Sequence, residues 1–282
     1  MKKLILSVAF ILAATVVFGQ AACNDCDITQ IPTGPRGSSI FGTNDSDVDQ
    51  VGIENKANVL QIGVANYSDI YQNGEENQAW VQQRGYRNHS DIVQLGDDNY
   101  GSVNQRGVMN YASQYVIGDD NEATAFQRGR MNTSIQTQTG DDNEASVVQF
   151  GRNNYAQQSQ DGDDNEATIG QWGRNNSALQ DQDGDNNDAT SYQVGSGNTS
   201  VETQTTSFGG ANTSMVNQIG FDNKACVTQD AGFLSSNNSY VLQIGADNFS
   251  SVDQSASFWF GGNNSTIGQF GVGNQACVEQ MN

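Results

Sequence analysis

The chain has 282 residues, with 32 acidic and 12 basic side chains and a formal net charge of −20. This acidity makes nucleic acid a poor partner, because a phosphate backbone selects basic surface. Only 35% of the residues are hydrophobic, and that composition alone is compatible with disorder. A disordered chain, however, has no reason to keep Asn and Gln in register over more than 200 residues, as this one does.

The N-terminus has the pattern of a secretory signal. Lys2 and Lys3 precede an apolar run over residues 4–18, and Gly19 offers a small residue for cleavage. We therefore expect residues 1–19 to be a signal peptide. No later segment approaches the ~20 apolar residues that span a bilayer, so we expect a secreted protein without membrane insertion.

Residues 20–43 are predicted to be a flexible leader. Both prolines of the chain, Pro32 and Pro35, lie in this segment. Because proline cannot donate to a β ladder, its absence from residues 44–282 is typical of strands paired on both sides.

From residue 44 onward an 11-residue unit repeats, with the pattern Asn-x-(Ala/Ser)-x-(Val/Ile)-x-Gln-x-Gly-x-x. Asn55–Ala65 and Asn143–Asn153 are examples. The Gln position holds Gln in every unit but one, where it is Val116. Alternate residues carry the pattern, which is the period of a strand. A chain that repeats one polar element in this way specifies a stack.

The repeat predicts an all-β fold, a two-sheet β-solenoid (β-helix) of 22-residue coils with two strand–turn units per coil. Gly and the two residues after it form each turn, because Gly takes positive φ without steric cost. With two units per coil, the array makes about 10.5 coils around a core about 10 Å thick. Stacked at about 4.8 Å, these coils give a rod roughly 50 Å long.

A core containing Asn and Gln requires stacking of identical residues. A buried amide without a partner costs about 1 to 3 kcal/mol, but an amide above another amide donates to one neighbour and accepts from the other. The predicted structural ladder comprises Asn55, Gln61, Asn77, Gln83, Asn99, Gln105, Asn121, Gln127, Asn143, Gln149, Asn165, Gln171, Asn187, Gln193, Asn274 and Gln280.

Charge follows the same period. Acidic turns recur about every 22 residues, and basic turns recur at the same interval between them. This alternation predicts one acidic and one basic edge. Asp98, Asp120, Asp142 and Asp164 represent the acidic edge, and Arg84, Arg106, Arg128, Arg152 and Arg174 the basic edge. The 11-residue spacing breaks only after Gln204, Gln229 and Gln254, always in a turn of the acidic edge.

The middle of the array departs from the pattern. Gln114, Gln136, Gln158 and Gln180, followed by Glu202, stand where most units have Val or Ile. We expect a local weak point there.

These residues resemble the curlin repeat of curli subunits, the secreted functional amyloids of bacterial biofilm, whose motif runs Gln-x-Gly-x-Gly-Asn-x-Ala-x-x-x-Gln. Residues 193–198 and 269–280 match it closely, and the resemblance covers residues 44–282. Most units here replace the second Gly of the motif by another residue. The resemblance implies export through an outer-membrane channel, a nucleator subunit as partner, and assembly into an extracellular cell-surface fibre, a fimbrium for biofilm matrix and cell adhesion.

Self-assembly also has a physical reason. The repeat continues to Gln280, so the last coil leaves unpaired backbone groups that template another copy.

The alternative is a monomeric secreted β-solenoid that binds Ca²⁺ through its carboxylates, a glycan, or ice through an outward Thr and Ser file. A β-helical polysaccharide enzyme is the weakest interpretation, because the coils are too regular. We expect no catalytic residues, no cofactor and no metal site.

The arginines, the cysteines and the histidine allow further predictions. The arginine file fits anionic matrix polymers, or the acidic edge of a neighbouring rod. Cys226 and Cys277 occupy equivalent outward positions two coils apart, roughly 9.6 Å, which is too far for an undistorted bridge. Cys23 and Cys26 suit a leader disulfide or free thiols. His89, the only histidine, is expected to be solvated.

Overall fold

A computed structural model describes residues 43–258 and 261–282, and the predicted signal peptide and all of the leader except Thr43 lie outside this range. The described residues contain no helix, and so none that could cross a membrane. The strands are β1 (Asp45–Ile53), β2 (Lys56–Val64), β3 (Tyr67–Glu75), β4 (Gln78–Tyr86), β5 (His89–Leu95), β6 (Tyr100–Val108), β7 (Tyr111–Ile117), β8 (Glu122–Arg130), β9 (Thr133–Thr139), β10 (Glu144–Arg152), β11 (Tyr155–Asp161), β12 (Glu166–Arg174), β13 (Ser177–Asp183), β14 (Asn187–Ser196), β15 (Thr199–Thr206), β16 (Ala211–Phe221), β17 (Lys224–Phe233), β18 (Ser236–Ala246), β19 (Phe249–Phe258), β20 (Gly262–Val272) and β21 (Gln275–Met281).

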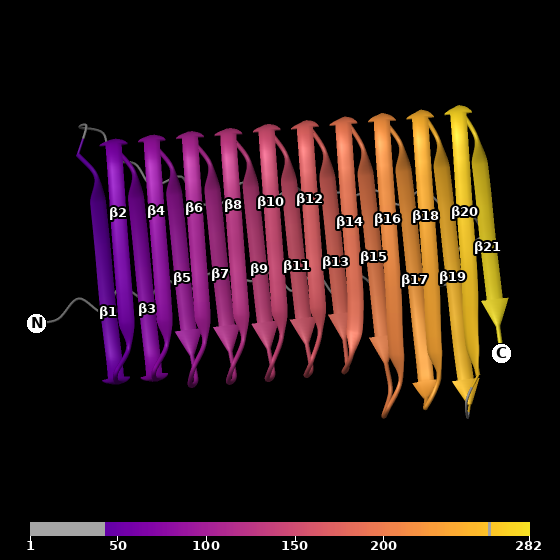
Figure 1. Cartoon of the computed structure of the whole chain (residues 1–282), viewed down its shortest axis with the longest axis horizontal. Coiled ribbons are helices and arrows are strands. Elements are labelled where there is room, and N and C mark those ends of the chain that lie inside the picture. The colour runs from indigo at the N-terminus through magenta and orange to yellow at the C-terminus, as the bar shows by residue number, and fades with distance from the viewer. Residues whose placement is uncertain (1–42, 259–260) are drawn as a thin grey trace, which may run out of the picture.

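The strands form two parallel sheets that face each other (Figure 1). The odd-numbered strands make an 11-stranded sheet and the even-numbered strands a 10-stranded sheet, each in chain order. Neighbouring strands pair in the register of the repeat, so that Val147 of β10 lies opposite Ile169 of β12, 22 residues on. The predicted two-sheet β-solenoid with two strands per coil is confirmed.

The core lies between the two sheets. It is built mainly from four kinds of side chain, which are Asn, a small residue (Ala or Ser), a β-branched residue (Val or Ile) and Gln. Along each strand alternate residues are buried, as in β10, where Ala145, Val147 and Gln149 are at most 1% exposed. Apolar clusters fill both ends of the core, around Ile70 and Ile92 toward the N-terminus and around Val216 and Val241 toward the C-terminus. A smaller apolar cluster around Val147 and Ile169 lies between them, and polar side chains at the equivalent positions of the facing strands separate the three clusters.

The turns require two residues with positive φ. Gly151 opens one of them with φ 123°, and Asn153 closes it with φ 54°. A Cβ on Gly151 would come 1.8 Å from the carbonyl oxygen of Gly173, so only glycine lets adjacent coils approach this closely. The closing position is the second Gly of the curlin motif, and here Asp, Arg, Met, Glu, Asn and Ala occupy it in the left-handed region, with φ between 51° and 60°.

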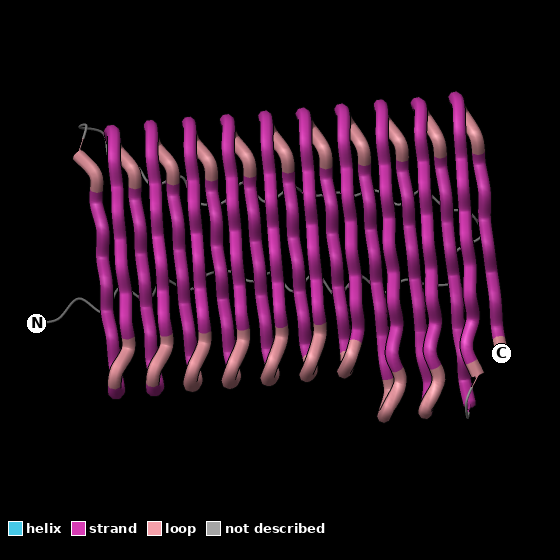
Figure 2. The backbone as a smooth tube through the Cα atoms, in the orientation of Figure 1, coloured by secondary structure: helices cyan, strands magenta, loops and turns pink. Residues whose placement is uncertain are grey.

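The two kinds of turn lie on opposite edges of the rod. Turns that lead from an odd to an even strand share one edge, and turns that lead from an even to an odd strand share the other (Figure 2). The three longer turns, after β15, β17 and β19, all project from the first of these edges. This is the edge on which the sequence predicts the insertions.

Candidate assembly interface

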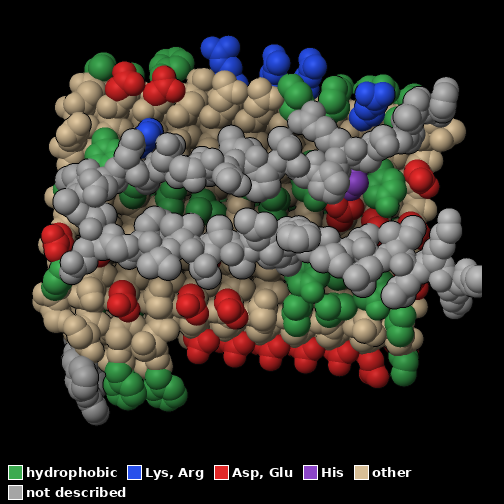
Figure 3. All heavy atoms as spheres, turned by 180° about the vertical axis from the view of Figure 1, so that it is seen from behind, with side chains coloured by type: hydrophobic (Ala, Val, Ile, Leu, Met, Phe, Trp, Pro, Cys, Tyr) green, Lys and Arg blue, Asp and Glu red, His purple; other side chains and the backbone are tan. Residues whose placement is uncertain are grey.

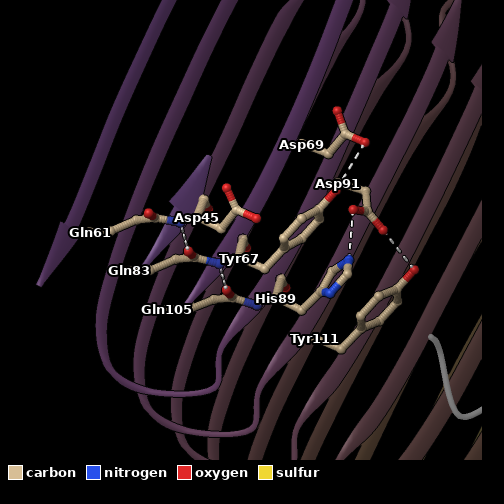
Figure 4. Close-up of polar contacts among 9 residues, drawn as sticks. All are labelled: Asp45, Gln61, Tyr67, Asp69, Gln83, His89, Asp91, Gln105 and Tyr111. Atoms are coloured by element: carbon tan, nitrogen blue, oxygen red, sulfur yellow. Dashed lines mark hydrogen bonds and ion pairs between the residues drawn. The ribbon is translucent and has the colours of Figure 1, made fainter. Parts of the chain in front are cut away.

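A file of glutamine amides runs through the interior with a fixed direction. Gln127 Nε2 donates to Gln149 Oε1 at 2.8 Å, and Gln127 Oε1 accepts from Gln105 Nε2 at 2.9 Å. The same Nε2 donates to the carbonyl of Tyr111 in the facing sheet at 2.8 Å. Figure 4 shows the file at Gln61, Gln83 and Gln105. A second file, which begins at Gln50, runs alongside in the odd-numbered strands. In both files each Gln–Gln hydrogen bond is donated toward the C-terminal end of the rod, so both files are polar.

The asparagine file runs in the opposite direction. The backbone N and Nδ2 of Asn121 both donate to Oδ1 of Asn99, at 3.1 Å each. Nδ2 also donates to the carbonyl of Gly140 at 2.7 Å. Along the file each asparagine therefore donates to the asparagine on its N-terminal side. The contact with Gly140 also ties the start of the strand to a turn of the following coil.

The opposed files make the two ends of the rod chemically different. At the C-terminal end, Gln280 has its Nε2 on the backbone carbonyl of Asn264 and no further amide to donate to among the described residues. At the N-terminal end, no described side chain donates to Oε1 of Gln50 or Gln61, which themselves donate inward to Gln72 and Gln83. One end therefore presents glutamine donors and the other glutamine acceptors.

The end coils expose what the other coils bury. The side chains that alternate inward in β21, from Ala276 to Gln280, are half-buried, whereas the equivalent side chains of β19 are buried. Directly before and after β21, the backbone groups of Asn274 and Asn282 face β19. Because successive residues of a strand point their N–H groups to opposite sides, Gln275, Cys277 and Glu279 direct theirs away from β19.

The acidic edge consists of two files with different roles. Oδ1 of Asp119 accepts the backbone N–H of Asp97 at 2.8 Å, and the same contact recurs from Glu75 to Asp97 and on to Asp185. We call Asp97, Asp119, Asp141, Asp163 and Asp185 the inner file. Asp98, Asp120, Asp142 and Asp164, the outer file, occupy the left-handed turn position and are exposed.

Repulsion along the outer file shows in its titration. Desolvation, and then the charges of Asp98 and Asp142 on the adjacent coils, raise the pKa of Asp120. The backbone contacts of the inner file were not foreseen, because the sequence does not distinguish the two carboxylates of an Asp-Asp pair.

The basic edge lies at the other ends of the strands. Arg84, Arg106 and Arg128 are aligned on β4, β6 and β8, and Arg130, Arg152 and Arg174 are aligned on β8, β10 and β12. Both files and Arg87 are exposed. Among residues 43–258 and 261–282, none of the seven arginines lies in an ion pair, and only Arg87 and Arg106 contact a ring, that of Tyr86 and of Phe126.

The polar run in the core has a hydrogen-bonded structure. Gln114, Gln136, Gln158 and Gln180 are at most 1% exposed and donate to one another in order at 2.9 to 3.0 Å. Gln180 then donates to Oε1 of Glu202 at 3.2 Å. Ser191 and Ser214 each donate to the same carboxylate at 2.5 Å. Glu202, which the pattern left unexplained, thus ends this third glutamine file.

His89 corrects one expectation. Its side chain is not solvated but 8% exposed, between the rings of Tyr67 and Tyr111, with centroids 4.7 and 5.2 Å away (Figure 4). His89 Nε2 lies 2.7 Å from Oδ1 of Asp91, whose Oδ2 accepts from the Tyr111 hydroxyl at 3.2 Å. The pattern could not predict this, because outward positions vary from unit to unit.

Cysteines and candidate metal ligands add little to the interface. Cys226 and Cys277 are both disulfide-bonded, so neither is a reactive thiol. Cys23 and Cys26 lie outside the described residues. Within residues 43–258 and 261–282, no group of three or more His, Cys, Asp or Glu side chains is placed to hold a metal ion.

The fold and its internal amide files define a parallel two-sheet β-solenoid. The family model of the curlin-associated repeat matches residues 118–151 and 140–173. The two matches are offset by one 22-residue coil, since 140 − 118 and 173 − 151 are both 22. Residues 118–173 of the chain therefore match the curlin-associated repeat. A search of curated proteins finds no match.

Proposed function

We propose that the chain is a structural subunit of an extracellular, curli-like amyloid fibre, that it has no enzymatic role, and that it assembles by head-to-tail stacking of solenoids. The observation that carries this proposal is the polarity of the amide files. Gln280 at one end offers donors, and Gln50 and Gln61 at the other offer acceptors. A second copy in the same direction continues the file.

The same polarity disfavours the two other ways in which rods could meet end to end. Two C-terminal ends in contact would place glutamine donors against donors, and two N-terminal ends would place acceptors against acceptors. Each leaves buried amide groups without partners, at about 1 to 3 kcal/mol per group. Among the described residues, β1 and β21 are edge strands of one sheet, and their outward backbone groups supply the rest of the contact between two rods.

The curlin repeat and the sequence pattern of residues 1–19 support the finer parts of the proposal. We propose secretion through an outer-membrane channel, fibre growth from a nucleator subunit, and a role in biofilm matrix and adhesion. Anionic matrix polymers are proposed as secondary partners of the basic edge.

The first experiment incubates the purified mature protein and records electron micrographs and fibre diffraction. Filaments with a reflection near 4.8 Å are expected. A preparation that remains single particles under all conditions would favour the monomeric binding module instead.

Two proline variants test the direction of stacking. Glu279→Pro removes an N–H that faces away from β19, so β21 stays paired while its outer side is blocked. Ser46→Pro is the counterpart in β1, because the N–H of Asp45 faces β3 and that of Ser46 therefore faces outward. At 1 M NaCl, which screens contacts between the charged edges, head-to-tail stacking predicts that each variant alone stays monomeric and that a mixture forms heterodimers. Dimers of either variant alone would contradict it.

A further inference from the structure

The acidic and basic edges occupy the same stretch of the rod. The turns before β4, β6, β8, β10 and β12 each carry two carboxylates, from Glu75 and Glu76 to Asp163 and Asp164. The same five even strands each have at least one arginine at their C-terminal ends: Arg84 and Arg87, Arg106, Arg128 and Arg130, Arg152, and Arg174. Figure 3 shows a row of acidic side chains along one edge and basic side chains along the opposite edge.

These opposite charges cannot meet within one molecule. The edges are separated by strands of up to nine residues in these coils, which is roughly 30 Å at the rise of a strand. The arginines have no acidic partner among the described residues, and each file repeats one charge at every coil. Like charges on adjacent strands repel each other. An array of opposite charge with the same spacing therefore lowers the electrostatic energy of each edge.

A second copy of this chain is such an array. Both edges have the coil repeat of about 4.8 Å, so carboxylates of one rod and arginines of another stay aligned over all five coils. The outer-file aspartates are held at the turn position that points them outward, and the inner file keeps one oxygen on the backbone. The longer turns after β15, β17 and β19 project beyond this stretch and bound it on the C-terminal side (Figure 2).

We propose that the acidic edge of one rod binds the basic edge of a second copy side by side. The contact uses different surfaces on the two molecules, so it does not close on itself and can continue into layers of rods. It goes beyond head-to-tail stacking, because it joins rods laterally whether or not they have assembled end to end. In a fibre it repeats in every subunit, and many weak pairs then act together.

Charge removal provides the first test. Arg130→Gln, Arg152→Gln and Arg174→Gln are combined, and a control combines Ser102→Glu, Ser146→Glu and Thr190→Glu on the outer face of the even-numbered sheet. Both change the net charge by −3. The arginine variant is expected to form filaments that bundle at least five-fold less in micrographs, whereas the control bundles as wild type. Equal bundling of the arginine variant and wild type would overturn the proposal.

Charge exchange provides the second test, at 0.15 M and 1 M NaCl. One protein carries Arg130→Glu, Arg152→Glu and Arg174→Glu, and the other carries Asp98→Lys, Asp120→Lys and Asp142→Lys. Neither is expected to associate laterally alone, and their mixture is expected to do so at 0.15 M but not at 1 M, where charges are screened beyond about 3 Å. A mixture no more bundled than its components would refute edge pairing.

Failure of fibre formation is kept separate from failure of edge pairing. The same charge variants are made with Glu279→Pro, which blocks end-to-end stacking, and lateral pairs of single rods are measured by sedimentation velocity. Pairs that form only between complementary edges support the proposal even if no filament grows. Single rods at every concentration for the complementary mixture would count against it.

Discussion

Gln180 donates to Glu202 across 3.2 Å, and this contact ends a glutamine file at a carboxyl group. The next residue along the file is Val227, which offers no acceptor to a glutamine. A carboxylate solves this problem because it accepts from Gln180, Ser191 and Ser214 together. The arrangement is unfavourable in another respect, because Glu202 is titratable and fully buried. The side chains around it carry no compensating positive charge.

The first prediction concerns the stability of the rod against pH. Desolvation raises the pKa of Glu202 to about 7, although hydrogen bonds from Ser191, Ser214 and Gln180 oppose the shift. Because the folded pKa lies above the unfolded value of 4.5, the folded state holds the proton more tightly and stability falls as pH rises from about 4.5 to about 7. At about 1.4 kcal/mol per pKa unit, the loss is about 3 kcal/mol.

Glu202→Gln should remove this step and stabilise the rod at pH 8 by about 1 to 3 kcal/mol. Chemical unfolding of the monomeric Glu279→Pro background at pH 5, 6, 7 and 8 measures it. Glu122→Gln, at an exposed residue of β8, is the control and should keep the wild-type slope. A Glu202→Gln protein with an unchanged slope would assign the pH dependence to other carboxylates.

The second prediction is a stabilising substitution at the single break in the glutamine file of the odd-numbered strands, which begins at Gln50. Val116 stands between Gln94 and Gln138 in register, and Oε1 of Gln138 has no hydrogen-bond partner. Val116→Gln would accept from Gln94 and donate to Gln138, so we expect a gain of about 1 to 2 kcal/mol in unfolding free energy.

Val147→Gln is the matched control, because Val147 is 1% exposed and lies between Ala125 and Ile169. It buries an amide without a file to join and should destabilise by about 1 to 3 kcal/mol. Similar effects of the two substitutions would mean that file continuity does not govern the stability of buried amides here.

The sequence predicts the fold well because each coil repeats the same constraints. Asn121, Gln127 and Gly129 recur in nearly every unit, and strand period, turn position and core composition follow from them. The side chains that differ between coils could not be placed. The pattern does not show that Asp97 and Asp98 take different roles, that His89 is enclosed by two tyrosines, or that Glu202 ends a file of amides. File direction is also invisible in sequence, because an amide can be turned either way.

The third prediction compares the two glycine positions of a turn, the opening position at Gly151 and the closing position at Gly273. Gly151→Ala would put a Cβ 1.8 Å from the Gly173 carbonyl oxygen at φ 123°. Adjacent coils would have to separate, and we expect loss of folding or a cost above about 4 kcal/mol. At Gly273 the φ is 68° and nothing lies within 4 Å of an added Cβ, so Gly273→Ala should cost only about 1 kcal/mol. Thermal unfolding of both variants gives the comparison, and equal costs would contradict the close approach of the coils at Gly151.

The fourth prediction separates the two acidic files by their effect on assembly. Neighbouring charges raise the pKa of Asp120, after desolvation, so the folded pKa exceeds the usual 3.8 and folded-state stability falls as pH rises through that range. Protonation or divalent cations should therefore speed fibre growth. Asp98→Asn, Asp120→Asn, Asp142→Asn and Asp164→Asn combined should shorten the lag at pH 7.5, because Asn tolerates the left-handed turn position as well as Asp does.

Alanine at the inner file should act in the opposite direction. Asp119→Ala removes the acceptor for the Asp97 N–H at 2.8 Å, so combined alanine substitutions at Asp119, Asp141 and Asp163 should lower stability and lengthen the lag. Dye fluorescence at pH 4 and pH 7.5, with and without millimolar Ca²⁺, measures both sets. Equal wild-type lag times at the two pH values would refute the electrostatic brake, and identical behaviour of the two files would refute their division into structural and repelling carboxylates.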